Sequence, residues 1–275
     1  MKLGLAQIFV QWENKELNKL HVKKCVEEFS KAVSEYNETA LLLFPEMSLT
    51  GFSMNTENTA DLDKETVEYC EELSEEYGVA IGIGWVKKKE KLCENHYSIV
   101  TPTKGEVSDY IKIHPFSYSE ENKFFKGGNK ISICELDNLK IGTAICYDLR
   151  FPEIFQVMSK DADLIIVPAN WPKKRRTHWN TLLAARAIEN QCFLAGINCC
   201  GLIGGIEYSG DSALYSPMGD SVEYIDVLED ADLNNKIFIY NISNSVSEIR
   251  KSFPVKQDRR EDLYIELIKE NKECL

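Results

Sequence analysis

The sequence predicts an α/β fold, and three observations lead to that prediction. Short apolar runs of strand length recur along the 275-residue chain, and amphipathic segments with helical periodicity lie between them. Glycines and prolines stand at the ends of these runs. No linker-like stretch divides the chain, so we expect one domain over residues 1–275, with a polar C-terminal tail from about residue 254.

The first half of the chain is predicted to begin with a strand, a helix and a second strand. Residues 3–9 alternate weakly, and apolar residues recur at helical spacing within 14–36. Residues 40–44 are a continuous apolar run, which Pro45 ends because proline cannot extend a central ladder. A further helix and further strands follow, at Glu65–Tyr77 and at 79–86, 95–100 and 107–113.

The second half is predicted to supply a second set of strands. We expect them at 131–134, 139–145, 164–167, 193–197, 211–215, 222–227 and 237–239. The segment 181–190 has a helical packing stripe, and 243–252 is expected to form a short helix.

Composition and charge exclude several classes of protein. The net charge of −12 argues against a nucleic-acid or anionic-membrane partner, because phosphate would be repelled over most of the surface. No segment approaches bilayer-spanning length. Nine cysteines without CxxC spacing make neither a disulfide framework nor a zinc set, which points to a reducing, cytoplasmic location.

Cys146 is the first candidate catalytic residue. It follows an apolar, β-branched run suited to a buried strand, and Asp148 and Pro152 suit the start of a helix, so the thiol falls on a strand-to-helix corner. At such a corner the backbone N–H of Tyr147 can bind an oxyanion. The alternative is that Cys146 is an inert core thiol, since free cysteine is among the most buried residue types.

Glu46 and Lys112 are the partners that a reactive cysteine needs. Glu46 directly follows a buried strand, and Lys112 lies at the end of another. A glutamate can take the thiol proton, and a lysine can stabilise the thiolate and the oxyanion formed when sulfur attacks a carbonyl or nitrile carbon. A cysteine–histidine pair with His114, two residues beyond Lys112, is a second possibility.

Five motifs in order resemble the nitrilase superfamily of carbon–nitrogen hydrolases: FPEMSLTGF, YIKIHPF, CYDLRFPE, ANWP and HWNTLLAARAIENQ. The resemblance runs almost from residue 3 to residue 250. CYDLRFPE, NWPxxRxxHW and a later GDS element are most similar to the omega-amidases, which hydrolyse the amides of 2-oxoglutaramate and 2-oxosuccinamate.

The resemblance implies a site and a fold. Cys146 would be the nucleophile, Glu46 the general base and acid, and Lys112 the transition-state cation, with no metal or organic cofactor. A second glutamate would support the lysine; Glu120 and Glu121 are adjacent, and the spacing favours Glu121. The implied fold is a four-layer αββα sandwich, dimerised through helices near the nucleophile, and the partner is a small-molecule amide.

Substrate binding is predicted from the NWPxxR motif. Arg175 is expected to meet a substrate carboxylate by bidentate contact, with Asn170 and Trp171 lining the amide end. The alternative is that the run KKRR is a solvated charge cluster.

Two rival functions share these residues. Another small substrate of the same superfamily, such as deaminated glutathione, a carbamoyl amine or a nitrile, would leave the fold and triad unchanged. A catalytically silent binding scaffold is the non-enzymatic alternative, although all three chemical residues are present.

Overall fold

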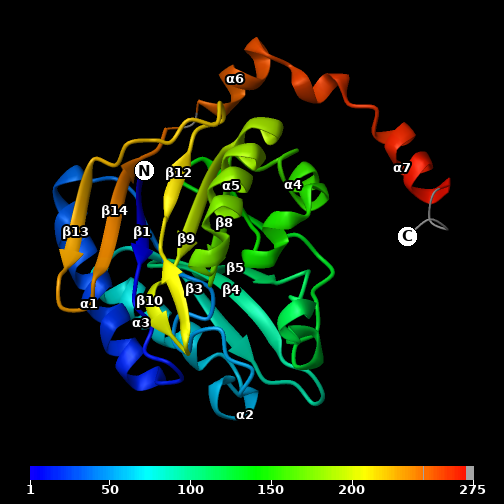
Figure 1. Ribbon diagram of the computed structural model, residues 1–275. Coiled ribbons are helices and arrows are strands. Elements are labelled where there is room, and N and C mark those ends of the chain that lie inside the picture. The colour runs from blue at the N-terminus through cyan, green and yellow to red at the C-terminus, as the bar shows by residue number, and fades with distance from the viewer. Residues whose placement is uncertain (244, 271–275) are drawn as a thin grey trace.

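The structure, a computed structural model, describes residues 1–243 and 245–270. Two β-sheets face one another in the middle of the molecule, and helices cover their outer faces (Figure 1). This arrangement confirms the predicted four-layer αββα sandwich.

The first sheet has seven strands. Three of them, β1 (Lys2–Gln7), β2 (Ala40–Leu43) and β3 (Ala80–Lys87), run parallel. The remaining strands pair antiparallel at the two edges: β4 (Glu94–Thr101), β5 (Gly105–Ile111), β13 (Asp226–Asp230) and β14 (Asn235–Asn241). The helices of this half are α1 (Lys15–Val33), α2 (Thr56–Thr59) and α3 (Glu65–Tyr77).

The second sheet has five strands in the order β12-β9-β8-β7-β6. Their bounds are Ala213–Tyr215, Phe193–Asn198, Leu164–Ala169, Leu139–Thr143 and Ile133–Leu136. Its helices are α4 (Pro152–Met158) and α5 (Arg176–Asn190), and a separate hairpin consists of β10 (Cys200–Ile203) and β11 (Ile206–Ser209).

Three apolar clusters correspond to the three contacts between layers. One packs α1 and α3 on the seven-stranded sheet, with Phe29 and Leu42 as members. The second lies between the sheets, where Leu5 and Ile166 belong to one cluster. The third packs α4 and α5 on the five-stranded sheet. Burial of these side chains is the main force that holds the layers together, and it places the carboxyl ends of β2 and β8 at a common edge.

Most of the elements that the sequence predicts are found, and three of the differences lie in the second half of the chain. Helix α5 begins at Arg176, five residues early, because its first turn is mostly polar and carries one apolar residue, Trp179, that packs with Leu183. The strand expected at 222–227 lies at Asp226–Asp230, since Val222 instead donates its N–H to Leu214 on the five-stranded sheet and the chain crosses between sheets after it. The β10–β11 hairpin was not predicted, and its two-residue turn is Gly204-Gly205, both with positive φ.

The C-terminal tail extends beyond the sandwich. Helix α6 (Val246–Ser252) takes up most of the short helix expected at 243–252, in which residue 244 lies outside the described residues. Past the 3-10 turn Val255–Asp258, helix α7 (Glu261–Glu270) has no buried residue and projects past α4 (Figure 1). The predicted tail continues through 271–275, which also lie outside the described residues.

Candidate active site

Cys146 lies where the chain leaves β7 and turns towards α4. A short 3-10 helix, Cys146–Arg150, forms the corner, and Cys146 itself has a φ of +45°, which residues other than glycine seldom adopt. The Asp148 carboxylate accepts the N–H of Ile145 at 2.9 Å and so fixes the turn. Cys146 is partly exposed, whereas the other cysteines in the described part of the chain are buried. The corner therefore leaves the sulfur accessible from one side, although protein atoms surround most of it.

Asp148 also holds His114. One carboxylate oxygen, Oδ1, accepts the His114 backbone N–H at 3.0 Å and lies 2.7 Å from its ring Nδ1. The ring stacks on Phe151 with centroids 3.8 Å apart. His114 thus supports the corner through Asp148, an arrangement that disfavours it as the base of a cysteine–histidine pair.

Lys112, Glu46 and Glu121 form a buried charged cluster. Glu46 follows Pro45 just beyond β2, and Lys112 follows the last residue of β5. The Lys112 Nζ lies 2.8 Å from Glu46 Oε1 and 2.9 Å from Glu121 Oε2, and none of the three side chains is more than 1% exposed. Three distant segments of the chain are therefore joined by one ammonium group.

The two adjacent glutamates differ sharply in environment. Glu121 is fully buried against Lys112, whereas the Glu120 side chain is 62% exposed and pairs with Lys123. The left-handed backbone at Glu120, with a φ of +61°, turns the chain between the two side chains. Glu121 is thus the glutamate that reaches the cluster.

The hydrogen bonds distinguish the roles of the two buried carboxylates. Glu121 accepts four, two from the Lys112 Nζ, one from Asn95 Nδ2 and one from the backbone N–H of Phe116. Glu46 accepts three, from Lys112, from Asn95 and, on Oε2, from the backbone N–H of Asn170. A carboxylate has about four acceptor sites. Glu121 is therefore saturated, and Glu46 keeps one lone pair on Oε2 that can take a proton.

Burial and charge set the protonation states. Burial raises the pKa of the Cys146 thiol well above its usual range, Glu46 adds to that shift, and Lys112 opposes it only in part. Burial would lower the pKa of Lys112, but Glu121 and Glu46 outweigh it and raise that pKa. These shifts favour a protonated thiol beside a charged lysine at neutral pH.

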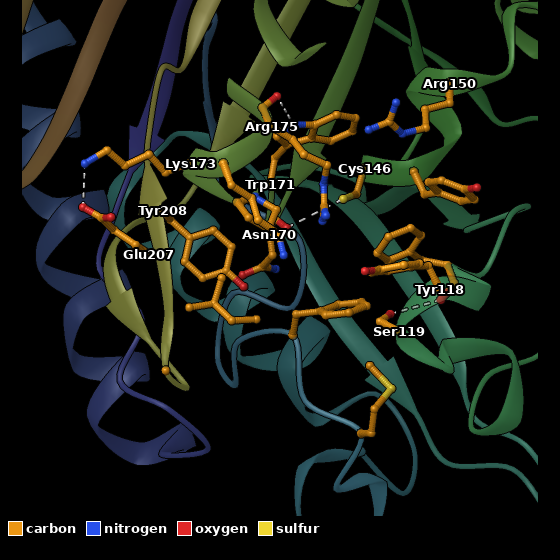
Figure 2. Close-up of a pocket in the computed structure, with 18 of the residues that line it drawn as sticks. Tyr118, Ser119, Cys146, Arg150, Asn170, Trp171, Lys173, Arg175, Glu207 and Tyr208 are labelled. Atoms are coloured by element: carbon orange, nitrogen blue, oxygen red, sulfur yellow. Dashed lines mark hydrogen bonds and ion pairs between the residues drawn. The ribbon is translucent and has the colours of Figure 1, made fainter. Parts of the chain in front are cut away.

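A cavity of about 710 Å³ opens over Cys146 and Lys112. Aromatic residues line much of it, among them Phe116, Trp171 and Tyr208, and Figure 2 shows the Cys146 sulfur facing into it. This volume is in the range of small-molecule sites, which are mostly apolar with a few polar groups.

The three residues predicted to bind substrate all line this cavity. Asn170, however, is bound to Glu46: its backbone N–H donates to Oε2 at 3.0 Å and its side chain to the Glu46 carbonyl at 2.6 Å. The Trp171 ring N–H donates to the carbonyl of Arg175 at 2.9 Å, which fixes the loop. The Arg175 guanidinium lies over the Phe116 ring, 5.3 Å from its centroid, and points into the cavity (Figure 2).

Sequence reasoning missed Arg150 and Asn95. The Arg150 guanidinium lies 4.7 Å from the centroid of the Trp171 ring, and within the described part of the chain neither it nor Arg175 pairs with a carboxylate. Burial lowers the pKa of Arg150, and the like charge of Arg175 adds to the shift. The position of Arg150 on the Cys146 turn was a usable signal. Asn95 lies within a strand and gave none.

Among residues 1–243 and 245–270, no group of three His, Cys, Asp or Glu side chains is placed to hold a metal ion. No helix in the same residues is long and apolar enough to cross a bilayer.

Comparisons with known proteins agree on one family. The family profile described as Carbon-nitrogen hydrolase matches residues 2–251. The 2-oxoglutaramate amidase of Bacillus subtilis is 33% identical over 84% of this chain and 88% of that protein. The omega-amidase YafV of Escherichia coli strain K12 is 30% identical over 95% of this chain and 97% of its own.

The solved structures lead to the same result. A CN-hydrolase superfamily protein from Xanthomonas campestris, crystallised with an arsenic adduct in its active site, superposes with a TM-score of 0.82 at 28% identity, covering 94% of this chain and 97% of that one. The matched residues 2–251 include the Cys146 corner and the buried cluster of Glu46, Lys112 and Glu121. This chain therefore belongs to the carbon–nitrogen hydrolase family.

Proposed function

We propose that this chain is an amidase that releases ammonia from a small 2-oxo dicarboxylic acid monoamide, as omega-amidases do. One observation carries the choice of substrate. Arg150 and Arg175 both line the cavity over Cys146, and neither meets a carboxylate within the part of the chain that the structure describes. Two guanidinium groups near one another favour an anionic ligand, because a carboxylate offsets their mutual repulsion.

The first half of the proposed reaction forms a thioester. The Cys146 sulfur attacks the amide carbon while its proton passes to the open lone pair of Glu46 Oε2. The Lys112 ammonium and the backbone N–H of Tyr147 hold the oxyanion. Glu46 then gives the proton to the amide nitrogen, the carbon–nitrogen bond breaks, and ammonia leaves.

The second half restores the enzyme. Glu46 takes a proton from a water molecule, whose oxygen attacks the thioester carbon. The carbon–sulfur bond breaks, the sulfur regains a proton from Glu46, and the free acid leaves. Burial raises the pKa of Glu121, but the Lys112 ammonium and the backbone N–H of Phe116 oppose that shift and favour the carboxylate, which keeps Lys112 in place.

A substrate panel tests the proposal. We would measure steady-state ammonia release from 2-oxoglutaramate, succinamate, asparagine and a simple nitrile, with the Cys146→Ala variant as the blank. We expect the highest kcat/KM for 2-oxoglutaramate and no turnover by Cys146→Ala. A higher kcat/KM for asparagine or the nitrile would contradict the proposed substrate class.

The arginine pair is tested separately. Arg150→Ala and Arg175→Ala should each raise KM by about tenfold and change kcat little. Tenfold corresponds to the lower end of the free energy of a hydrogen bond between charged groups, because both side chains are partly exposed. Lys173→Ala is the matched control, since Lys173 lines the same cavity but already pairs with Glu207 at 2.7 Å. An unchanged KM in both arginine variants would show that the substrate carboxylate binds elsewhere.

A larger amide such as deaminated glutathione is the second candidate. The cavity of about 710 Å³ has room for more than a five-carbon acid. Adding deaminated glutathione to the panel decides between them: a kcat/KM above that of 2-oxoglutaramate would favour the larger substrate.

We also propose that the chain acts as a homodimer in the cytoplasm. Val157 on α4 and Ile188 on α5 are about half exposed, at 50% and 54%, on the helical layer nearest Cys146, which supports pairing through that layer. Light scattering after size exclusion should give twice the chain mass, and Ile188→Asp should reduce the measured mass.

The free cysteines of the described residues fit a reducing compartment, which cell fractionation would test.

A further inference from the structure

We propose that Asn95 is a positioning residue of the active site: its side-chain amide joins the two buried carboxylates and leaves Glu46 Oε2 as the only catalytic acceptor. Asn95 lies on β4, is 1% exposed, and is placed opposite Val86 of β3 by the strand register. The inference deepens the proposed function, because it rests on Glu46 being the base.

The amide uses both hydrogens of one nitrogen. Nδ2 donates to Glu46 Oε1 at 2.9 Å and to Glu121 Oε1 at 3.2 Å. The backbone carbonyl of Asn95 also accepts the backbone N–H of Lys112 at 2.9 Å. One residue thereby contacts every member of the buried cluster and fixes the backbone that carries the lysine.

The other end of the amide has no partner. Asn95 Oδ1 is buried and makes no hydrogen bond within the described residues. A buried acceptor left alone is unfavourable, and a leucine of similar size would avoid it. The opposite amide orientation would set Oδ1 against two carboxylates, so the N–H groups must face them. The two N–H donors of Asn95 are therefore its contribution to the site, and the unpaired Oδ1 is the unfavourable consequence.

The donors matter because the cluster is rich in negative charge. Around Glu46 the titratable groups are Lys112, Glu121 and Cys146, with Cys199 and Tyr208 beyond them. Burial raises the pKa of both Cys199 and Tyr208, so these two stay neutral at working pH. Both Lys112 and the Asn95 amide donate to Glu46 and to Glu121. The amide does so without adding charge to the cluster.

Two variants of Asn95 test the inference. In Asn95→Leu we expect kcat to fall about ten- to hundredfold with KM nearly unchanged, because a donor to a charged group is lost. The acidic limb of the kcat/KM profile should move to higher pH, since losing an N–H donor disfavours the charged carboxylate. In Asn95→Asp a third carboxylate replaces the donor, and activity relative to Asn95→Leu should recover as the pH falls and the new carboxyl gains a hydrogen to donate.

The control is Asn190→Leu, a buried asparagine on α5 that bonds Arg186 and Ser159. It should lower the melting temperature without moving the acidic limb. A wild-type kcat and acidic limb in Asn95→Leu would overturn the inference; if that variant does not fold, an unshifted limb in Asn95→Asp would do so.

Alkylation of Cys146 by iodoacetamide gives a readout that needs no substrate. Its rate depends on transfer of the thiol proton towards Glu46, so its pH profile should shift in Asn95→Leu in the same direction as kcat/KM. A shifted alkylation profile with no turnover of any amide would leave the positioning role standing while the proposed substrate failed. An unshifted profile would overturn the positioning role whatever the substrate.

Discussion

Replacing Glu121 by glutamine would test whether this carboxylate holds the catalytic lysine. Glu121 accepts four hydrogen bonds, and a glutamine at this position would turn an NH₂ group towards two of the four donors. Each charge-assisted hydrogen bond is worth about 1.5–3 kcal/mol, and Lys112 keeps its contact with Glu46. We therefore expect a loss of about 3 kcal/mol in the free energy of unfolding, or roughly 5–10 °C in melting temperature.

The same variant should lose activity, because a displaced Lys112 no longer meets the oxyanion. Loss of one such donor commonly lowers kcat by about 10²–10³. Thermal unfolding and ammonia release would measure the two effects. Glu120→Gln is the matched control: the neighbouring side chain is exposed and pairs only with Lys123 in the described chain, so neither quantity should change. Wild-type values in Glu121→Gln, or equal losses in Glu120→Gln, would refute the reasoning.

Two further predictions concern packing and pH. A Cβ at Gly84 would lie 2.5 Å from the Met47 backbone nitrogen, so Gly84→Ala should displace Glu46 and reduce kcat by at least tenfold. Gly142→Ala is the control: its Cβ would meet mainly flexible side chains at 3.2 Å or more, so this variant should keep most of its activity. Burial raises the pKa of Cys25 and of Cys192 to about 12. The unfolded chain loses these protons first, at about pH 8.5, so each thiol should lower stability by about 1.4 kcal/mol per pH unit above that value. Urea unfolding at pH 7, 9 and 10 in reductant checks this, and a constant midpoint would contradict it.

The sequence could locate those site residues that follow the end of a predicted strand. Glu46, Lys112 and Cys146 each follow a segment with a clear strand pattern, and the structure joins them at one end of the sandwich. Hydrophobic periodicity is a local property, so it survives in a single sequence. Parallel strands bring their carboxyl ends to one edge, which converts that local pattern into a shared location.

Contacts that depend on register and side-chain direction could not be predicted. Asn95 reaches Glu46 because β4 pairs with β3 in one register, and a shift of one residue would turn it to the other face. Asn170 lines the cavity, as the sequence predicted, and its side chain also bonds the Glu46 carbonyl, a contact that the sequence did not show. The residues next to Asn170 in the sequence do not reveal this contact, because the carbonyl that accepts it lies 124 residues away in the chain.

The charge of the buried cluster accounts for the division of roles in the proposed reaction. Two carboxylates and one ammonium give the resting centre a net charge of −1 as long as Cys146 keeps its proton, as its raised pKa implies. In the proposed reaction, sulfur attacks, Glu46 takes that proton, the new negative charge is on the oxyanion beside Lys112, and the sum is still −1. When ammonia carries the proton away, Glu46 is ionised again and the thioester is neutral. Because the site is buried, a step that changed this sum would be costly. The saturated Glu121 supplies the constant charge that lets Glu46 gain and lose a proton while Lys112 remains charged.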